Sequence, residues 1–333
     1  MNASCAEGNV LLRTKNLYKV FPQPRTIFAQ IGRVPPKLLK AVDHVSLDIY
    51  QGENLGLVGE SGCGKSTLAR TMIRLYDCDG GNVYFEGKDI MALSAKELRK
   101  ERKNFQMIFQ DPCSSLNPRM SVMEILKEVY LYHGICSKAE AENRCLELME
   151  MTGLNRNFAN RFPGEFSGGQ RQRLGIARAL ALRPKLVIAD EPVSALDVSI
   201  QAQILNLLLE LQKKTGITLL FISHDLRVVR YVSQRVAVMY LGRVVELAPT
   251  EEVYKHSLHP YTGILLKANP GLDPRSRNPQ AIIKGDPPSP IDLPNGCRFH
   301  PRCPYGMPAC REKEPQLEEA SPGHYVACHC LKR

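Results

Sequence analysis

The stretch GESGCGKST, residues 59–67, decides the fold of this 333-residue chain. It has the spacing G-x-x-x-x-G-K-S, in which Gly59 and Gly64 are followed by Lys65 and Ser66. A short apolar run, residues 54–58, precedes it, and apolar residues recur at helical spacing from 68 to 73. This order of strand, Gly-rich loop and helix favours a phosphate-binding loop over a Gly-rich turn without a ligand.

The residue types in this loop suit a polyphosphate. Glycines let backbone N–H groups turn towards the ligand, and the N-terminus of the following helix adds the positive end of a dipole. We expect Lys65 to reach the β- and γ-phosphates and Ser66 to offer its hydroxyl to Mg²⁺. The loop therefore predicts binding of a nucleotide with its magnesium ion.

The composition is that of a globular protein, with 44% hydrophobic and 23% charged residues. No apolar run approaches the ~18 residues of a membrane helix, and the first twenty residues lack a secretory core, so we expect a cytosolic chain. Eleven cysteines in such a chain indicate metal binding rather than disulfides. The net charge of +10 is consistent with nucleic acid or an anionic membrane as partner, and equally with a scattered soluble surface.

The first half of the chain reads as strands followed by a helical insert. Residues 11–20 and 41–49 alternate apolar with polar residues on either side of a Pro-rich, exposed loop. Residues 80–82 predict a turn before a strand at 83–85, and the apolar run 105–109 ends at Gln110. Residues 112–165 predict helices, because Ser121-x-x-Glu124 and Ser137-x-x-Glu140 form capping boxes.

The second half carries further candidate site residues. Ser167 is a good helix N-cap, and the glycines after it leave N–H groups uncovered, which indicates a second anion site. An apolar strand, 186–189, ends at Asp190 and Glu191, and Mg²⁺ on ATP would give such buried carboxylates a partner. Another strand, 217–222, ends just before His224.

Together these motifs resemble the ATP-binding subunit of an ABC transporter over about residues 10–255. The resemblance implies an α/β fold, with a P-loop NTPase core, an antiparallel β part and a helical subdomain at about residues 112–175. It implies a nucleotide-binding domain over 1–255 and a small Cys-rich C-terminal extension over 256–333.

The resemblance also assigns roles to residues. The aromatic residue beside adenine is best matched by Phe21, although Tyr18 or a purely structural role for either ring stays open. Phe166 stands before the signature where the family usually has leucine. The Walker A loop is Gly59, Ser61, Gly62, Cys63, Gly64, Lys65, Ser66 and Thr67; the Q-loop residue is Gln110; the signature is Ser167, Gly168, Gly169 and Gln170; the Walker B acid is Asp190; the catalytic carboxylate is Glu191; the D-loop residue is Asp197; and the switch histidine is His224.

The family mechanism needs two such domains. Lys65 and Mg²⁺, held by Ser66, Gln110 and Asp190, would neutralise the phosphates while Glu191 orients water. One chain has one Walker A loop and one signature, and in the family the signature of one subunit covers the ATP of another. An alternative is a soluble ABC-type ATPase that acts on nucleic acid, but such proteins usually carry two ABC domains or long coiled coils. An inactive structural subunit is disfavoured because the reacting residues are intact.

The C-terminal part narrows the resemblance to ATPases of oligopeptide and dipeptide importers. His259-Pro260-Tyr261-Thr262 is followed by a Pro-rich stretch and a group of cysteines. The resemblance implies a second ATPase subunit in a heterodimer, two transmembrane permease subunits and an extracytoplasmic substrate-binding protein. It implies a peripheral position on the cytoplasmic face of the inner membrane and no nucleic acid. Related ATPases also serve importers of nickel, sugars and antibiotic-like peptides.

In that family the cysteines are associated with a four-iron four-sulfur (4Fe-4S) cluster, and we expect one here, with zinc as the first alternative and free thiols as the last. The intervals of five, six and seventeen residues lack the paired knuckles of common zinc sites. Few large apolar side chains accompany the cysteines, so a metal would stabilise this segment. The expected ligands are Cys297, Cys303, Cys310 and either Cys328 or Cys330, while Cys5, Cys63, Cys78, Cys113, Cys136 and Cys145 are expected to be small apolar fillers.

Overall fold

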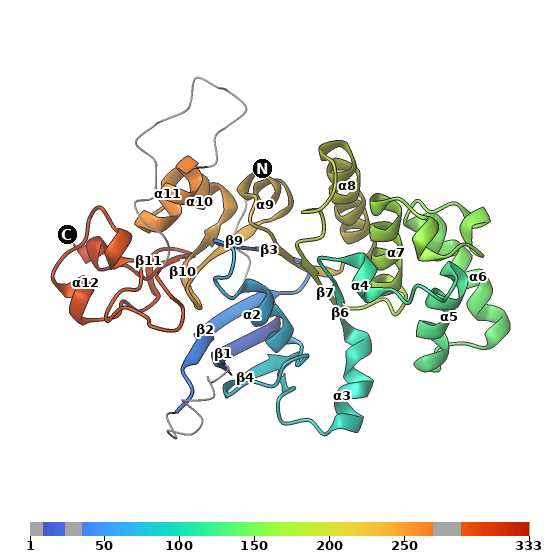
Figure 1. The fold of residues 1–333 in the computed structure, drawn as a ribbon, viewed down its shortest axis with the longest axis horizontal. Helices are drawn as coiled ribbons and strands as arrows, with labels where there is room; N and C mark the ends of the chain where they lie inside the picture. Colours follow the sequence, from blue (N-terminus) through green and yellow to red (C-terminus); the bar gives the residue numbers. More distant parts are fainter. Residues whose placement is uncertain (1–8, 24–34, 269–287, 333) are drawn as a thin grey trace. The chain divides into compact units, whose positions relative to one another are not determined.

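The computed structural model describes residues 9–23, 35–268 and 288–332, which divide into two compact units (Figure 1). The first unit contains Met1–Tyr50, Leu55–Ala92 and His224–Arg333, and the second contains Gln51–Asn54 and Leu93–Ser223. The predictions for Cys5 and for much of both Pro-rich stretches lie outside the described residues, as does the side chain of Cys113.

An antiparallel sheet of the first unit has the strand order β2-β1-β4-β5. Its strands are β1 (Val10–Pro22), β2 (Leu38–Tyr50), β4 (Gly80–Phe85) and β5 (Lys88–Asp89). Helix α2 (Lys65–Met72) packs against β1 and β2. The alternation seen in the sequence therefore marks two strands that each bury one face, as antiparallel strands commonly do.

The predicted turn at residues 80–82 is wrong, because β4 already begins at Gly80. Gly80 pairs with Tyr18 and Asn82 with Lys15, across an irregularity in the register. Gly81 has φ 78° there, and a side chain on it would collide with the backbone of Asn16. The glycine thus serves a close approach of two strands at a bulge, which single-sequence patterns do not separate from a turn.

The remaining strands of the first unit lie side by side, and each is hydrogen-bonded to the next. Strand β3 (Asn54–Val58) runs parallel to β9 (Arg235–Tyr240), which turns back into β10 (Arg243–Pro249). Strand β10 then pairs with β12 (His324–Val326), and β12 with β11 (Glu318–Ser321). The C-terminal segment, residues 288–332, therefore adds two strands beside β10.

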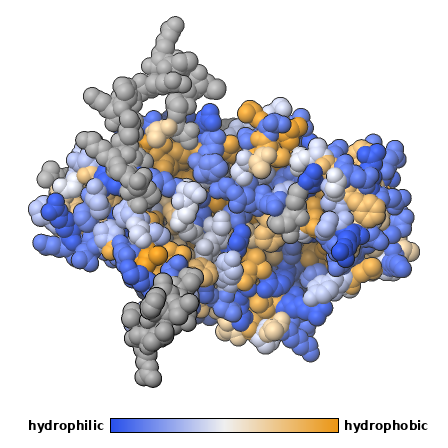
Figure 2. All heavy atoms as spheres, in the orientation of Figure 1, coloured by the Kyte–Doolittle hydropathy of each residue, from blue (hydrophilic) through white to orange (hydrophobic). Residues whose placement is uncertain are grey.

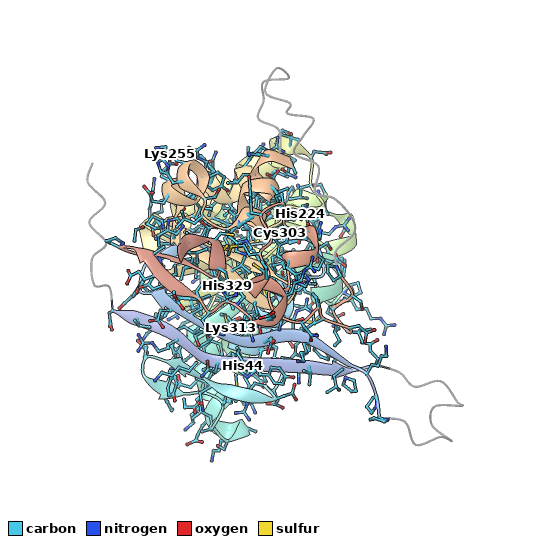
Figure 3. All side chains as sticks on the ribbon, turned by 90° about the vertical axis from the view of Figure 1, so that its left-hand side faces the viewer. His44, His224, Lys255, Cys303, Lys313 and His329 are labelled. Carbon is cyan, nitrogen blue, oxygen red and sulfur yellow. The ribbon has the colours of Figure 1, made fainter. Side chains whose placement is uncertain are left out.

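One helix of the first unit packs against both β9 and β10. Helix α10 contacts β9, β10 and α9, and Figure 1 draws α10 and α11 close together. Figure 3 looks onto the C-terminal segment, where the His329 Nε2 donates a hydrogen bond to the Lys313 carbonyl, 2.8 Å away. The helices and short helical turns are α9 (Leu226–Val232), α10 (Thr250–His256), α11 (Pro260–Ala268), η5 (His300–Arg302), α12 (Ala309–Glu312) and η6 (His329–Lys332).

The second unit is built on three parallel strands. Strand β6 (Phe105–Ile108) pairs with β7 (Leu186–Asp190), and β7 pairs with β8 (Thr218–Ile222). Every residue of β7 and β8 is buried, as expected for parallel strands that read as continuous apolar runs. The sequence prediction of these strands is confirmed.

Helices surround these strands and form the insert predicted from the capping boxes. Ser121 and Ser137 each accept a hydrogen bond from the backbone of the glutamate three residues later, so both capping boxes are confirmed. Gly153 lies just after the C-cap of α6, and Gly216 is the C-cap of α8; both glycines have positive φ. The helices and helical turns are α3 (Ala95–Glu101), η1 (Arg102–Asn104), α4 (Pro112–Ser115), α5 (Val122–Tyr132), α6 (Lys138–Met151), η2 (Arg156–Phe158), η3 (Pro163–Glu165), α7 (Gly168–Leu180) and α8 (Val198–Thr215).

The surface drawn in Figure 2 mixes hydrophilic residues with smaller hydrophobic areas. Within residues 9–23, 35–268 and 288–332, no helix has the length and apolar character required to cross a membrane.

Candidate functional site

The Gly-rich loop of the first unit lies between β3 and α2. Lys65 is the first residue of α2 and is buried, and its Nζ donates to the carbonyls of Gly59 at 2.8 Å and Glu60 at 3.0 Å. Gly64, the N-cap, has φ 107°, and a side chain there would collide with the Ala41 carbonyl. No side chain caps this helix end, so the loop presents a lysine and backbone N–H groups, which is a suitable cradle for phosphate.

Cys63 lies inside the loop but does not have the properties of a reactive thiol. Its side chain is buried, and that burial raises the pKa of the thiol even though Lys65 acts to lower it. The sulfur lies 3.8 Å from the Lys65 Nζ. Cys63 therefore fills space as predicted, and Cys145 in α6 is likewise fully buried.

The acidic residues of the second unit lie at the carboxyl end of β7. Asp190 is fully buried at the last position of the strand. Glu191 follows with φ 46°, a left-handed conformation that is unusual outside glycine. The Gln110 Nε2 donates to the Glu191 Oε2 at 3.0 Å. The ends of β6 and β7 thus bring together a carboxylate and an amide that the sequence placed 81 residues apart.

Ser167 is the N-cap of α7, as predicted. Its hydroxyl accepts from the Gln170 N–H at 3.3 Å, and the Gln170 Oε1 accepts from the Ser167 N–H at 3.0 Å. Phe166 is buried and packs edge-on against Phe158, with 5.7 Å between ring centroids. The aromatic residue in place of leucine therefore serves packing and leaves the cap intact.

The glycines of the signature lie beside the start of α8 within the second unit. A Cβ on Gly168 would be 3.1 Å from Leu196, and one on Gly169 would be 2.6 Å from Ile200. Asp197, the predicted D-loop residue, is the N-cap of α8. The second unit therefore places the predicted signature next to the predicted D-loop residue.

The remaining predicted residues lie in the first unit. Phe21, near the end of β1, packs edge-on against Tyr76 with ring centroids 5.7 Å apart, and Lys19 lies over its ring. Tyr18 instead packs against His44 at 5.2 Å. His224 is exposed, is the first residue of the segment His224–Arg333 in the first unit, and is labelled in Figure 3.

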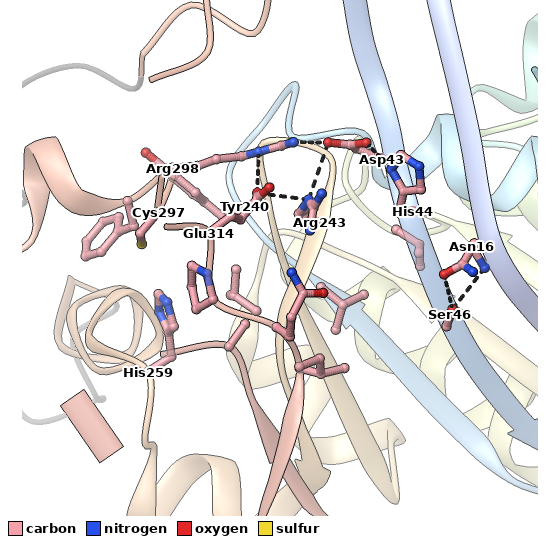
Figure 4. Close-up of a pocket in the computed structure, with 18 residues that line it drawn as sticks. Asn16, Asp43, His44, Ser46, Tyr240, Arg243, His259, Cys297, Arg298 and Glu314 are labelled. Atoms are coloured by element: carbon pink, nitrogen blue, oxygen red, sulfur yellow. Dashed lines mark hydrogen bonds and ion pairs between the residues drawn. The ribbon is translucent and has the colours of Figure 1, made fainter. Parts of the chain in front are cut away.

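A cavity of about 230 Å³ lies in the first unit, between β2, β10 and the C-terminal segment (Figure 4). Arg298 pairs with Asp43 and Glu314, and Arg243 pairs with the same two carboxylates at 3.3 and 3.0 Å. Burial alone would raise the pKa of Asp43, but Arg298, His44 and Arg243 together lower it. The charges balance in pairs, so this cluster fastens the C-terminal segment rather than forming an anion site.

The cysteines of the C-terminal segment approach one another without forming a ready metal site. The thiol of Cys297 interacts electrostatically with Cys310 and Cys303, and that of Cys328 with Cys330 and Cys297. Burial raises the pKa of Cys297 to about 11 and that of Cys328 to about 12, so both are protonated at neutral pH. Among the residues that the structure describes, no three Cys, His, Asp or Glu side chains are arranged to bind one metal ion.

Sequence reasoning missed two residues that contact the Gly-rich loop and a third that supports one of them. Tyr261 of α11 accepts a hydrogen bond from the Glu60 N–H at 2.9 Å, and Arg302 of η5 pairs with the Glu60 carboxylate. Tyr240, at the end of β9, accepts from Arg302 at 3.2 Å. The motif HPYT drew attention to Tyr261, but no local signal distinguishes Arg302.

A lysine-bearing phosphate loop, an acidic strand end beside a glutamine, and a capped Gly-Gly helix together define a P-loop ATPase cassette. The family model "ABC transporter" matches residues 42–194, and "Oligopeptide/dipeptide transporter, C-terminal region" matches residues 245–310. The solved "Dimeric structure of a post-hydrolysis state of the ATP-binding cassette MJ0796 bound to ADP and Pi" is similar with a TM-score of 0.63 and 30% identity, over 72% of this chain and 98% of that one.

Two curated relatives match along most of their length. The oligopeptide transport ATP-binding protein AppF of Bacillus subtilis (strain 168) is 51% identical over 98% of this chain and 99% of its own. A putative peptide import ATP-binding protein of Brucella ovis is 52% identical over 87% of this chain and 92% of its own. The chain belongs to the ATP-binding proteins of ABC transporters, and the resemblance drawn from its motifs is confirmed.

Proposed function

We propose that this chain binds and hydrolyses ATP to power the import of di- and oligopeptides through a membrane ABC transporter. The observation that carries the proposal is the full-length similarity to an oligopeptide transport ATP-binding protein, together with the intact loop around Lys65. An importer of another solute, such as nickel or a sugar, is the alternative. A soluble ATPase that acts on nucleic acid is less consistent with the C-terminal family match.

Each reacting residue has a proposed role in hydrolysis. Lys65 exchanges its contacts with loop carbonyls for the β- and γ-phosphates, and Glu191 orients the attacking water. The Gln110 amide holds the Glu191 carboxylate in place in the second unit. His224 donates to the γ-phosphate.

Oxygen donors are available for magnesium in the residues proposed to bind it. The Asp190 carboxylate is buried at a strand end, and the Gln110 amide oxygen and Ser66 hydroxyl complete a donor set of the kind that Mg²⁺ prefers. Bound Mg²⁺ would neutralise charge on the β- and γ-phosphate oxygens. The nucleotide contacts would come from Gly59, Ser61, Gly62, Cys63, Gly64, Lys65, Ser66, Thr67 and Phe21.

We also propose that ATP is sandwiched between two ABC subunits. Ser167, Gly168, Gly169, Gln170 and Asp197 would cover the nucleotide of the partner subunit. The proposal is supported by the capped, exposed start of α7 and by its proximity to the D-loop. The similar cassette of known structure is described as dimeric and bound to ADP and Pi.

The proposed assembly contains a second ATPase subunit, two permease subunits and a substrate-binding protein. This chain would lie peripherally on the cytoplasmic face of the inner membrane. We propose residues 1–255 as the nucleotide-binding domain, with a helical subdomain at about 112–175, and residues 256–333 as the importer-specific extension. The match of the C-terminal family model to residues 245–310 supports this extension.

A 4Fe-4S cluster, with zinc as the alternative, remains a proposal for Cys297, Cys303, Cys310 and Cys328 or Cys330. The mutual approach of their thiols supports it, although some rearrangement and deprotonation would be needed. Anaerobically purified protein should be brown, and Cys303→Ser should remove the colour and make the chain protease-sensitive after about residue 290. Colourless protein with stoichiometric zinc favours the alternative, and protein with neither metal refutes both.

The central test of ATP hydrolysis is Glu191→Gln in the assembled transporter. The variant should bind ATP like the wild type but hydrolyse it roughly 10²- to 10⁴-fold more slowly, because a positioned base contributes about that much. Glu210→Gln, on an exposed position of α8, is the matched control and should retain activity. Wild-type turnover in Glu191→Gln would remove this residue from the mechanism, and ATP-independent peptide uptake would reject the proposed function.

A further inference from the structure

Glu60 of the phosphate loop is held at three separate points. Its carbonyl accepts from the Lys65 Nζ at 3.0 Å, and its N–H donates to the Tyr261 hydroxyl at 2.9 Å. Its carboxylate accepts two hydrogen bonds from Arg302, whose Nη1 and Nη2 lie 3.0 and 3.1 Å from its two oxygens. Two of these three contacts come from the C-terminal part of the chain.

The pair between Arg302 and Glu60 is embedded in the protein rather than exposed on its surface. The side chain of Arg302 is 6% exposed and that of Glu60 is 23% exposed. Arg302 also donates to the Tyr240 hydroxyl at 3.2 Å, and its guanidinium lies 5.9 Å from the centre of that ring. A two-pronged pair between planar groups fixes orientation as well as charge, which a solvated pair of lysine and carboxylate does not.

Packed aromatic side chains support both contacts. Tyr240 and Tyr261 are fully buried, with their ring centroids 4.6 Å apart, and Phe299 packs edge-on against Tyr240 at 5.4 Å. Burial raises the pKa of Tyr261, so its hydroxyl stays neutral and accepts from the loop N–H. The groups that hold Glu60 are therefore themselves held in place.

ATP binding places two demands on this loop. Lys65 must leave the carbonyls of Gly59 and Glu60 to reach the phosphates, which removes the ammonium that now bridges both ends of the loop. The Glu60 carboxylate also adds negative charge next to a polyphosphate, and like charges in a partly buried site repel strongly. A fixed cation on Glu60 meets both demands.

We propose that Arg302 is a positioning residue of the nucleotide site, which neutralises Glu60 and, with Tyr261, keeps the phosphate loop in its binding conformation when Lys65 engages ATP. The inference rests on the proposed ATP-binding function. It gives the C-terminal segment a role in nucleotide affinity through Arg302, and this role requires no bound metal.

The test measures MgATP affinity of the full-length chain by titration calorimetry. Arg302→Met keeps an unbranched apolar stem but removes the guanidinium and its charge, and it should weaken MgATP binding roughly tenfold, within the usual range of coupling between sites. Glu60→Gln in the Arg302→Met background should restore most of that affinity, because the uncompensated carboxylate is gone. Arg311→Met, on an exposed position of the same segment, is the control and should bind like the wild type.

A purely structural role for Arg302 predicts a different result. Loosening of the C-terminal segment would appear as faster hydrogen exchange in residues 297–330, and Glu60→Gln would not restore affinity. Tyr261→Phe provides a second test, since it removes only the hydroxyl on the Glu60 N–H and should weaken binding several-fold. In the assembled transporter, Arg302→Met should raise the KM for ATP more than it lowers kcat.

Several outcomes would overturn the inference. Equal MgATP affinity in Arg302→Met and the wild type would do so, and so would a double variant that binds as weakly as Arg302→Met alone. Failure of the wild-type chain itself to bind MgATP would instead reject the proposed function, so the two failures are distinguishable.

Discussion

The imidazole of His259 is a group whose protonation the fold opposes. Its side chain is 2% exposed, and its Nδ1 accepts a hydrogen bond from the Tyr261 N–H at 3.1 Å, which places the proton of the neutral ring on Nε2. Burial lowers the pKa of His259 to about 4, although the nearby Glu246 acts to raise it. An unfolded chain would protonate this group at about its ordinary pKa of ~6.5.

The sign of the effect follows from proton binding in the two states. Between about pH 4 and pH 6.5 the unfolded chain binds more protons at His259 than the folded chain, so stability rises with pH across this window. The contribution is fully present above about pH 6.5 and is lost as the pH falls to about 4. At about 1.4 kcal/mol for each pH unit, the loss amounts to about 3 kcal/mol.

The variant His259→Asn isolates the contribution of His259 protonation to the free energy of unfolding. Asparagine does not titrate, and its side-chain oxygen can accept from the N–H two residues further on, as the histidine does. Denaturant unfolding should show that, as the pH falls from 7.5 to 4, the free energy of unfolding drops by about 3 kcal/mol more in the wild type than in the variant. Hydrogen exchange should accelerate at low pH in residues 257–268 of the wild type.

His256→Asn, at an exposed position of α10, is the matched control and should keep the wild-type pH dependence. The reasoning would be refuted if His259→Asn and the wild type lost stability in parallel as the pH falls.

Three further variants test other parts of the site. Lys65→Ala should weaken ATP binding roughly 10- to 100-fold in a filter assay, because a charged hydrogen-bond partner of the phosphates is lost; unchanged binding would contradict its role. Ser167→Arg should reduce photolabelling of the partner subunit, whereas loss confined to this chain's own loop would argue against a shared site. Phe299→Ala should lower the free energy of unfolding by about 3–5 kcal/mol in denaturant, and an unchanged midpoint would show that its aromatic cluster is dispensable.

Much of the fold could be predicted because its signals are local. The parallel strands β7 and β8 are continuous apolar runs, and Ser121, Ser137 and Ser167 carry their capping partners three residues away. The same locality explains why the phosphate loop and the acidic strand end were recognised. Gly81 shows the limit, since a glycine at a bulge and a glycine in a turn look alike in one sequence.

The parts of the site that escaped prediction depend on distant pairs. Arg302 and Glu60 are separated by 242 residues, and Arg298 and Asp43 by 255. A charged residue in a polar, Pro-rich segment is normally taken as solvated, and only the contact of Arg302 with the Tyr240 ring, which itself packs against Phe299, shows otherwise. The left-handed backbone of Glu191, whose N–H donates to the Ile222 carbonyl, was equally unpredictable, because no local signal in the sequence marks it.

The short strand β11 has a consequence for the solubility of the chain. Without β11 and β12, strand β10 would present unpaired backbone groups along a sheet edge, which invites pairing with other molecules. In the folded chain β11 is the edge strand instead. All four of its residues are exposed, and two of them, Glu318 and Glu319, carry like charges that oppose pairing with a further strand. A chain shortened before residue 318 should therefore aggregate even where its ATP-binding residues are complete.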